Sequence, residues 1–339
     1  MNNLRSHNDF EHNIFDFNNY PFPALALDIY RMQSQENPVY QQYVNSVHRG
    51  WEGLLKPSQI PFLPISFFKS HTIKTGNFEP ELVFESSGTT QTINSRHELK
   101  KASLYQQSFL LAFEEFYGSA KDWCILGLLP SYLERQNSSL VVMVDELVKL
   151  SNHPQSGFYL YDHARLHEQL LELEARGQKT LLIGVSFALL DFAEQYPMQL
   201  KHTLVMETGG MKGRRRELTR QELHQYLCER LGVSSVHSEY GMTELLSQAY
   251  SSEGGIFRCP PWMKVFLREE DDPFAIITAE DVQEGQPVNG VINVIDLANI
   301  YSCSFIATDD MGKLYANGSF EVLGRLDNTD IRGCSLMAV

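Results

Sequence analysis

A loop of small hydroxyl residues around one glycine is the part of this sequence best suited to chemistry. It comprises Ser86, Ser87, Gly88, Thr89 and Thr90, and an apolar run at 82–84 leads into it. Such a turn presents backbone N–H groups and hydroxyl donors to an anion, and its glycine lets the backbone approach closely. A polyphosphate is the natural ligand. The loop lacks the G-x-x-x-x-G-K-[ST] pattern, and a plain Ser/Thr-rich turn is the alternative explanation.

A second segment whose side chains could take part in binding or catalysis reads Glu-Tyr-Gly-Met-Thr-Glu at 239–244. Tyr240 offers a flat aromatic face, Thr243 offers a hydroxyl, and Glu244 offers a carboxylate able to hold Mg²⁺ through oxygen. A tyrosine of the core and a charge at the start of a helix are the ordinary explanations for the same residues.

A third group of polar residues lies near the end of the chain. Asp309 and Asp310 come first, and Gly324-Arg325-Leu326-Asp327 follows further along. A carboxylate suits ribose hydroxyls, whereas an arginine suits a carboxylate or a phosphate. A turn and a surface cation are the ordinary alternatives. All three segments in this order are much less expected by chance than any one of them alone.

The elements that must position these residues alternate along the middle of the chain. Apolar runs predict strands at 82–84, 123–129, 180–185 and 203–206, and helical spacing predicts helices at 97–117, 138–150, 186–195 and 219–231. This alternation is typical of an α/β fold, whose ligands sit outside the carboxyl ends of the strands. The hydroxyl loop and Gly209-Gly210 both follow predicted strands, so we expect them to converge on one crevice.

The two ends of the chain have a different character. Residues 23–50 show helical spacing, and strands are predicted at 265–267, 275–278, 291–294 and 305–307 with little helix between them. We therefore expect an N-terminal helical and extended segment at 1–80, an α/β core at 81–260, a β-rich subdomain at 261–323 and a hinge-like tail at 324–339.

Composition narrows the class of protein. The chain has 339 residues, 43% of them hydrophobic, and its net charge of −14 argues against a general nucleic-acid or anionic-membrane surface. No apolar stretch approaches the roughly 20 residues of a membrane span, and the N-terminus lacks the apolar core of a signal peptide. The five cysteines are scattered without a C-x-x-C pair, which suits the cytoplasm and gives no zinc or disulfide framework. Cys124, Cys228 and Cys303 are predicted to be core residues.

Taken in order, these segments resemble the signature of the adenylate-forming superfamily, which contains acyl-CoA synthetases, phenylacetate-CoA ligases and luciferases. That signature is a Ser/Thr/Gly phosphate loop, Y-G-x-T-E, a T-G-D-like aspartate and G-R-x-D. Within the superfamily the chain looks most like a LuxE-type acyl-protein synthetase. The residues that carry the narrower likeness are those at 61–71, 84–90, 129–135 and 332–334.

The resemblance implies that ATP and Mg²⁺ are used to activate a carboxylic acid, which is a fatty acid in the LuxE type. It implies that the loop from Ser86 to Thr90 holds the departing pyrophosphate. Thr243 would contact the α-phosphate, and Glu244 would hold the metal.

The resemblance also implies how the nucleoside is held and which fold holds it. It places Tyr240, Gly241 and the Gly209-Gly210 turn at the adenine, and it places Asp310 at the ribose with Arg325 beside it. The implied fold is the adenylate-forming N-terminal-domain fold, in which layered α/β subdomains are joined by a small β-rich subdomain.

The sequence departs from the superfamily pattern at two positions within the motifs. Gln91 follows the hydroxyl loop where many members have glycine. Asp309 stands where a glycine usually precedes the aspartate, so the assignment of the ribose-binding residue to Asp310 is open by one residue.

A larger departure concerns the C-terminal end. Members typically continue well past G-R-x-D into a mobile lid that carries a catalytic lysine, whereas this chain ends at Val339. We therefore expect the fold without the usual C-terminal lid domain. The candidates to replace the lid lysine are Lys69, Lys212 and Arg332.

LuxE-type proteins pass the activated acyl group to a cysteine near their own C-terminus and then to a reductase partner. Cys334 lies five residues from the end and is the matching thiol, and Arg332 nearby would favour its thiolate form. A small, partly buried hydrophobe is the alternative role for this cysteine. An acyl-accepting reductase or a carrier protein is therefore an expected partner.

Other classes of protein fit parts of the sequence. Residues 184–188 place Ser186 after a predicted strand, as in a hydrolase, but they lack the second glycine of G-x-S-x-G. We predict instead that Ser186 caps the next helix. A degenerate adenylation fold that binds ATP or a hydrophobic acid without reaction is a second alternative. A third keeps adenylation but replaces Cys334 with coenzyme A, a carrier-protein thiol, or an amine or hydroxyl.

Overall fold

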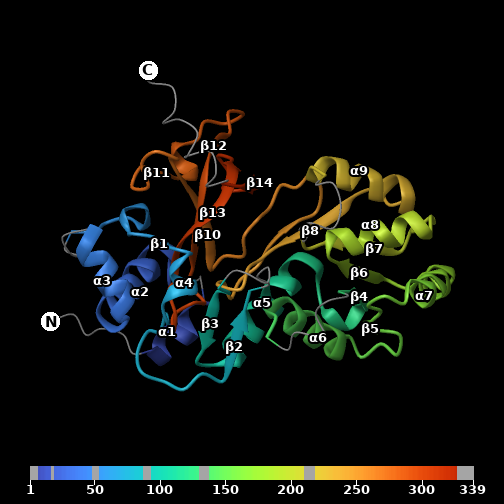
Figure 1. Cartoon of the computed structure of the whole chain (residues 1–339), viewed down its shortest axis with the longest axis horizontal. Coiled ribbons are helices and arrows are strands. Elements are labelled where there is room, and N and C mark those ends of the chain that lie inside the picture. The colour runs from blue at the N-terminus through green and yellow to red at the C-terminus, as the bar shows by residue number, and fades with distance from the viewer. Residues whose placement is uncertain are drawn as a thin grey trace.

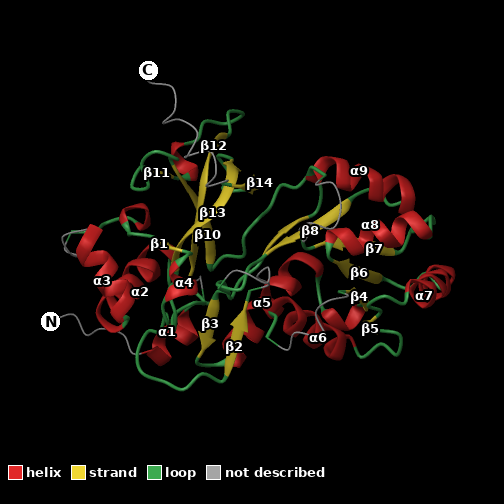
Figure 2. Ribbon diagram, viewed as in Figure 1, coloured by secondary structure: helices red, strands yellow, loops and turns green. Residues whose placement is uncertain are grey.

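The computed structural model describes residues 7–16, 19–47, 53–86, 93–129, 137–209 and 218–326 of the chain. Within these ranges, the strands form two six-stranded sheets and one two-stranded hairpin (Figure 1). In the view of Figure 2, the hairpin lies below the β-rich sheet of β10, β12 and β13 and to the left of the sheet that contains β4 to β8.

The first large sheet forms the α/β core and is mostly parallel. Its strands are β4 (Cys124–Leu128), β5 (Gly157–Phe158), β6 (Thr180–Gly184), β7 (Thr203–Glu207), β8 (Val236–Tyr240) and β9 (Ala249–Ser251), in the order β5-β4-β6-β7-β8-β9. Only the last pairing, β8 with β9, is antiparallel among these strands. Every position of β4 and β6 is buried. Strands that are apolar throughout need cover on both faces of the sheet.

Five helices provide that cover within the described residues. They are α5 (Ala102–Tyr117), α6 (Ser139–Ser151), α7 (His163–Ala175), α8 (Ser186–Gln195) and α9 (Arg220–Leu231). Figure 1 shows α8 and α9 on one face of the sheet and α5 and α6 on the other. Local sequence defines the ends of α9, because Thr219 and Glu222 form a capping box and Gly232 follows with a left-handed φ of 67°.

The second large sheet carries the β-rich half of the fold. Its strands are β1 (Leu63–Pro64), β10 (Met263–Arg268), β11 (Ile276–Ile277), β12 (Val288–Asp296), β13 (Phe305–Leu314) and β14 (Phe320–Arg325). β12 pairs with one edge of β13, while β1 and β14 share the other edge. β1 thus brings a segment from the first eighty residues into a sheet built mainly after residue 262.

The N-terminal helices differ from the single predicted helix at 23–50. The structure has α1 (His7–Asn13), α2 (Phe22–Glu36), α3 (Pro38–Val47) and the short α4 (Phe67–Ser70). The prediction was wrong between α2 and α3, because Pro38 lacks the N–H that would continue the first helix. Asn37 is extended there, and its side chain accepts a hydrogen bond from the Tyr40 N–H at 3.0 Å to begin the second helix.

Ser86, the first residue of the hydroxyl loop, directly follows β2 (Leu82–Glu85), which pairs antiparallel with β3 (Arg96–Leu99). The prediction of a helix from residue 97 was therefore wrong at its start, and α5 begins only at Ala102. Residues 96–99 alternate in burial and pair with β2, which is the pattern of a half-buried strand. The predicted domain boundaries remain predictions.

Candidate active site

Three motif residues from two different sheets meet in one cluster. Tyr240 ends β8, Asp310 lies in β13, and Arg325 ends β14. The Tyr240 hydroxyl donates to Asp310 Oδ2 at 2.9 Å, and Arg325 Nε lies 3.5 Å from Asp310 Oδ1. Burial raises the pKa of Asp310, while the Tyr240 hydrogen bond and the Arg325 charge lower it. The Tyr240 ring is buried against Phe257 and Phe320, with ring centroids 5.9 and 5.5 Å away.

The two neighbouring aspartates have different surroundings. Asp310 is buried with Tyr240, whereas Asp309 is exposed and lines a cavity of about 400 Å³ with Tyr43 and Phe62. Consecutive residues of a strand point to opposite faces, so only one of the pair can share a face with the Tyr240 cluster. The geometry thus favours Asp310 as the motif aspartate, although its role remains a prediction. The cavity lies beside Asp309, away from the contact with Tyr240.

The turn that carries Thr243 and Glu244 is held by buried polar side chains. His97 Nδ1 donates to the Thr243 carbonyl at 2.8 Å, because a carbonyl can only accept. Asn299 donates its amide to the Glu244 carbonyl at 2.7 Å. Asp296 accepts from the N–H groups of residues 246 and 247 at 2.8 and 3.0 Å. These three supporting residues were missed at sequence level, where Asp296 showed only as the end of an apolar run.

The side chain of Glu244 lies beside the start of the hydroxyl loop. It is 5% exposed, and burial raises its pKa, while a hydrogen bond with Ser95 and the charges of Arg325 and Lys69 lower it. Ser95 also donates its N–H to the Ser86 hydroxyl at 2.9 Å. Ser95 therefore links Ser86 to Glu244, and among the described residues Lys69 is the lid-lysine candidate whose charge acts on this carboxylate.

A single carboxylate of this kind fits the predicted Mg²⁺. Magnesium is commonly held by one or two carboxylates together with substrate phosphates and water. Among the described residues no cluster of three or more His, Cys, Asp or Glu side chains could hold a metal by itself. Glu244 would thus supply a protein ligand beside the phosphates, as the sequence predicts.

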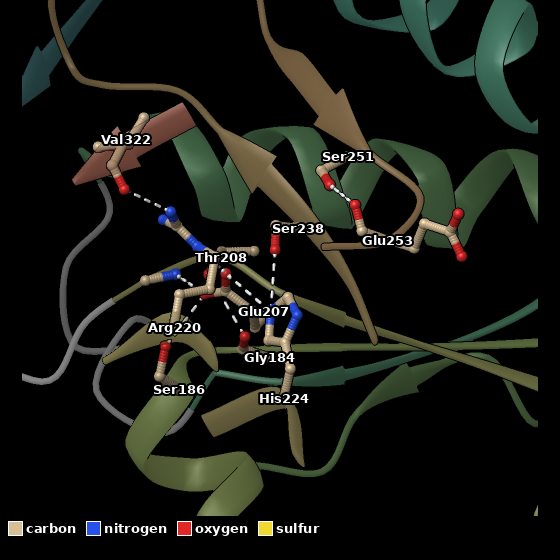
Figure 3. Close-up of polar contacts among 11 residues, drawn as sticks. Gly184, Ser186, Glu207, Thr208, Arg220, His224, Ser238, Ser251, Glu253 and Val322 are labelled. Atoms are coloured by element: carbon tan, nitrogen blue, oxygen red, sulfur yellow. Dashed lines mark hydrogen bonds and ion pairs between the residues drawn. The ribbon is translucent and has the colours of Figure 1, made fainter. Parts of the chain in front are cut away.

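Glu207 anchors the glycine turn that follows β7 (Figure 3). Its Oε2 accepts from the Gly209 N–H at 2.7 Å and from the Ser186 hydroxyl at 3.1 Å. On the other side, Oε1 lies 3.2 Å from Arg220 Nε and 3.7 Å from His224 Nε2. Gly209 has a φ of 74°, which glycine adopts without steric cost. Glu207 therefore fixes a left-handed turn at the position predicted to lie beside adenine.

The same carboxylate connects the two sheets through Arg220. Arg220 Nη1 donates to the Val322 carbonyl of β14 at 2.7 Å, and its guanidinium lies 5.1 Å from the Phe257 ring centroid. Burial by itself would raise the pKa of Glu207, but His224, Arg220 and other donors lower it to about 2. Sequence patterns gave no signal for this pair, because its residues stand 13 positions apart and belong to different elements.

The prediction that Ser186 caps α8 was wrong. Val185 is the residue before the helix, and no side chain caps it. The Ser186 hydroxyl donates to Glu207 instead, since that buried carboxylate accepts a stronger, charge-assisted hydrogen bond.

The remaining predicted residues divide between described and undescribed segments. Gly241 and Thr243 lie in the turn after β8, the first exposed and the second half-buried. Outside the described residues are Ser87, Gly88, Thr89, Thr90, Gly210, Lys212, Arg332 and Cys334. The core prediction is confirmed for Cys124 and Cys303, which are fully buried, while Cys228 is half-buried on α9.

Comparison with solved structures identifies similar folds. An ATP-bound RpMatB–BxBclM chimera is 18% identical with a TM-score of 0.53, and the match covers 74% of this chain and 49% of the chimera. ATP-bound MatB from Rhodopseudomonas palustris is also 18% identical, with a TM-score of 0.51 over 74% of this chain and 49% of MatB. The chain therefore spans about half the length of these proteins.

At that identity the likeness concerns the fold alone. It confirms the predicted α/β fold of the adenylate-forming N-terminal domain. No protein-family model matches the sequence, and no curated protein does so either. In the described part of the chain, every helix is too short or too polar to cross a membrane.

Proposed function

We propose that this chain uses ATP to activate a carboxylic acid as an acyl-adenylate and releases pyrophosphate. The observation that carries the proposal is the meeting of Tyr240, Asp310 and Arg325 from two sheets. The charge of Arg325 also acts on Glu244, which connects this cluster to the turn beside Ser86. The likeness in fold to ATP-bound structures supports the same assignment.

The proposed reaction joins two anions. A carboxylate oxygen of the acid attacks the α-phosphorus of ATP, and the bond from that phosphorus to the bridging oxygen breaks as pyrophosphate leaves. Donors already in place offset the repulsion and stabilise charge that develops at phosphorus. Thr243 would contact the α-phosphate, and the loop from Ser86 to Thr90 would hold the leaving pyrophosphate.

The nucleoside and the metal would be held by the surrounding residues. Asp310, beside Arg325, would accept hydrogen bonds from the ribose hydroxyls. Tyr240 and the Gly209-Gly210 turn would lie at the adenine. Glu244 would hold Mg²⁺, which when bound neutralises phosphate charge.

The second half of the proposed function is acyl transfer to a thiol. The LuxE-type resemblance supports Cys334 as that thiol and a fatty acid as the acid, with a reductase or carrier protein receiving the acyl group afterwards. The thiolate would attack the acyl carbonyl carbon, and AMP would leave as the thioester forms. Scattered cysteines support a cytoplasmic setting. Coenzyme A, or a biosynthetic amine or hydroxyl, is the alternative acceptor.

ATP–pyrophosphate exchange over a panel of carboxylic acids tests the proposal. Exchange of labelled pyrophosphate into ATP that requires both the acid and Mg²⁺ is the expected result. Release of ADP and phosphate would overturn the adenylation mechanism. Binding of ATP without exchange across the whole panel would favour the non-catalytic binder.

A further inference from the structure

Glu239, the residue before Tyr240, places a carboxyl group next to the candidate active site. It is half-buried on β8, and its side chain points away from the face that carries Ser238 and Tyr240. A Cβ added to Gly241 would overlap the Glu239 carboxylate, so this side chain lies against Gly241 at the start of the turn after β8. Among the described residues, it forms neither a hydrogen bond nor an ion pair.

Two further polar groups without partners lie at the same place. Tyr250 is the cross-strand neighbour of Glu239, and the Gln248 side chain lies 3.3 Å from the Cβ position of Gly241. Gln248 is 4% exposed and Tyr250 is 2% exposed. Neither the Gln248 side-chain oxygen nor the Tyr250 hydroxyl has a hydrogen-bond partner within the described residues. Leaving each of these two buried groups without a partner costs roughly 1–3 kcal/mol, so a ligand that bonds to them beside Glu239 would be favoured.

Aromatic rings from α5 surround these groups. Tyr250 lies 5.3 Å from the ring centroids of both Phe116 and Tyr117. Burial raises the pKa of Tyr105, Tyr117 and Tyr250, and the nearby Glu239 charge raises it further. The faces of aromatic rings attract cations.

The local field also favours a positive ligand. Burial, together with the nearby Glu207 anion, raises the pKa of Glu239 to about 8. Arg258 is a neighbouring cation, since its guanidinium lies 5.7 Å from the Phe116 ring centroid and its charge acts on Tyr117, but among the described residues it forms no ion pair with Glu239. A protonated amine would pair with the ionised carboxylate and donate to the amide oxygen. A second anion would meet repulsion from Glu207, and an apolar chain would leave all three polar groups unsatisfied.

We propose that Glu239, Gln248 and Tyr250 form a subsite for an ammonium group, and that the acid activated by this chain carries a protonated amine. The substrate class is then an amino acid, in place of the fatty acid that the LuxE-type resemblance implies. This subsite rests on the proposed function, because its ligand is the acid that is adenylated.

The test is ATP–pyrophosphate exchange with matched acids on the full chain. The panel contains the twenty protein amino acids and linear ω-amino acids of three to eight carbons. Each is paired with the acid that lacks the amine and with the acid that carries a hydroxyl in its place. At least one amino acid is expected to exceed both of its partners tenfold or more in kcat/KM, a difference of about 1.4 kcal/mol.

Variants separate this subsite from a general effect on the fold. Glu239→Gln should lower kcat/KM for the preferred amino acid at least tenfold and leave its deaminated partner within twofold. Glu253→Gln changes an exposed carboxyl just after β9 and should leave both values unchanged. Thermal unfolding checks that each variant is folded. Gln248→Leu removes the amide oxygen of the subsite and should also lower kcat/KM for the preferred amino acid.

The outcomes distinguish the subsite from the reaction. Best exchange with an unsubstituted acid, unaffected by Glu239→Gln, would overturn the ammonium subsite and leave adenylation intact. Preference for the hydroxy acid over the amino acid would overturn it as well, because a neutral donor would then suffice. Exchange with no acid of this panel or of the broader carboxylic acid panel, fatty acids included, would reject the proposed function itself.

Discussion

Asp309 and Asp310 share a chemical type and a strand, yet their contacts differ completely. Asp310 is buried, accepts from Tyr240 and pairs with Arg325, whereas Asp309 is exposed beside a cavity. A carboxylate that already orients a phenol and a guanidinium is preorganised to accept further donors, such as ribose hydroxyls. We therefore expect nucleotide binding to depend on Asp310 and not on Asp309.

Asp310→Asn is expected to lower kcat/KM for ATP by about tenfold to a hundredfold, because the charge that faces Arg325 is removed. Asp309→Asn is the matched control and should remain within twofold of the wild type. Exchange kinetics at varied ATP measure both. The reverse pattern would shift the assignment of the motif aspartate by one residue.

The thiol of Cys334 is expected to accept the acyl group. Incubation with ATP, Mg²⁺ and the preferred acid should leave on the chain an acyl group that neutral hydroxylamine removes. Cys334→Ser should keep pyrophosphate exchange and lose this labelling, since a hydroxyl is a far weaker nucleophile at neutral pH. Mass spectrometry of the intact chain detects the adduct. Wild-type protein that exchanges pyrophosphate but never becomes acylated would mean that the acceptor is another molecule.

At the scale of elements, the pair of Glu207 and Arg220 connects β7 to the start of α9 and to β14. Glu207 holds the Gly209 turn, while Arg220 holds the Val322 carbonyl. Removing one member of a buried ion pair leaves the other charge uncompensated, which typically costs 3–5 kcal/mol. The pair thus ties the glycine turn to the strand that ends at Arg325.

Glu207→Gln should lower the free energy of unfolding, and the loss should depend on pH. The pKa of Glu207 is about 2 in the folded chain against 4.5 ordinarily, so its stabilisation is fully present above pH 4.5. It is lost as pH falls toward 2, at about 1.4 kcal/mol per pH unit. Urea unfolding between pH 7 and pH 3 should show the difference between wild type and variant shrinking below pH 4.5. A difference that stays constant over this range would contradict the ion-pair account.

At the scale of the whole molecule, the candidate site belongs to no single sheet. Tyr240 comes from the α/β core, Asp310 and Arg325 come from the β-rich sheet, and Ser86 comes from the hairpin. A ligand that contacts all of these elements binds the folded chain and not the unfolded one. Nucleotide binding should therefore be linked to global stability.

ATP with Mg²⁺ at about one hundred times its Kd is expected to stabilise the folded chain by about 2.7 kcal/mol. The unfolding midpoint should rise by several degrees in a thermal scan. Asp310→Asn should reduce this rise at the same ATP concentration, while Asp309→Asn should preserve it. An unchanged midpoint for the wild type at saturating ATP would argue against a nucleotide site that bridges the sheets.

Local sequence determined much of the secondary structure and the composition of the motifs. The fully buried strands β4 and β6 consist almost entirely of apolar residues and glycine, and α9 carries its own capping box and terminal glycine. Such features act over a few residues, so they can be read without knowing the fold. The same short range explains the missed break at Pro38 and the missed strand β3, which is defined by pairing with β2.

Only the tertiary structure decided how the motifs are combined. Tyr240 and Asp310 stand 70 positions apart, and the Ser95 bridge between Ser86 and Glu244 leaves no pattern in the sequence. The Glu239 carboxyl, which has no partner in the described part of the chain, also gives no sequence signal, because partners depend on which distant segments pack nearby. The sequence by itself determines which side chains are present. Burial and the distances between charges set the pKa values and contacts, and they arise only when distant segments pack together.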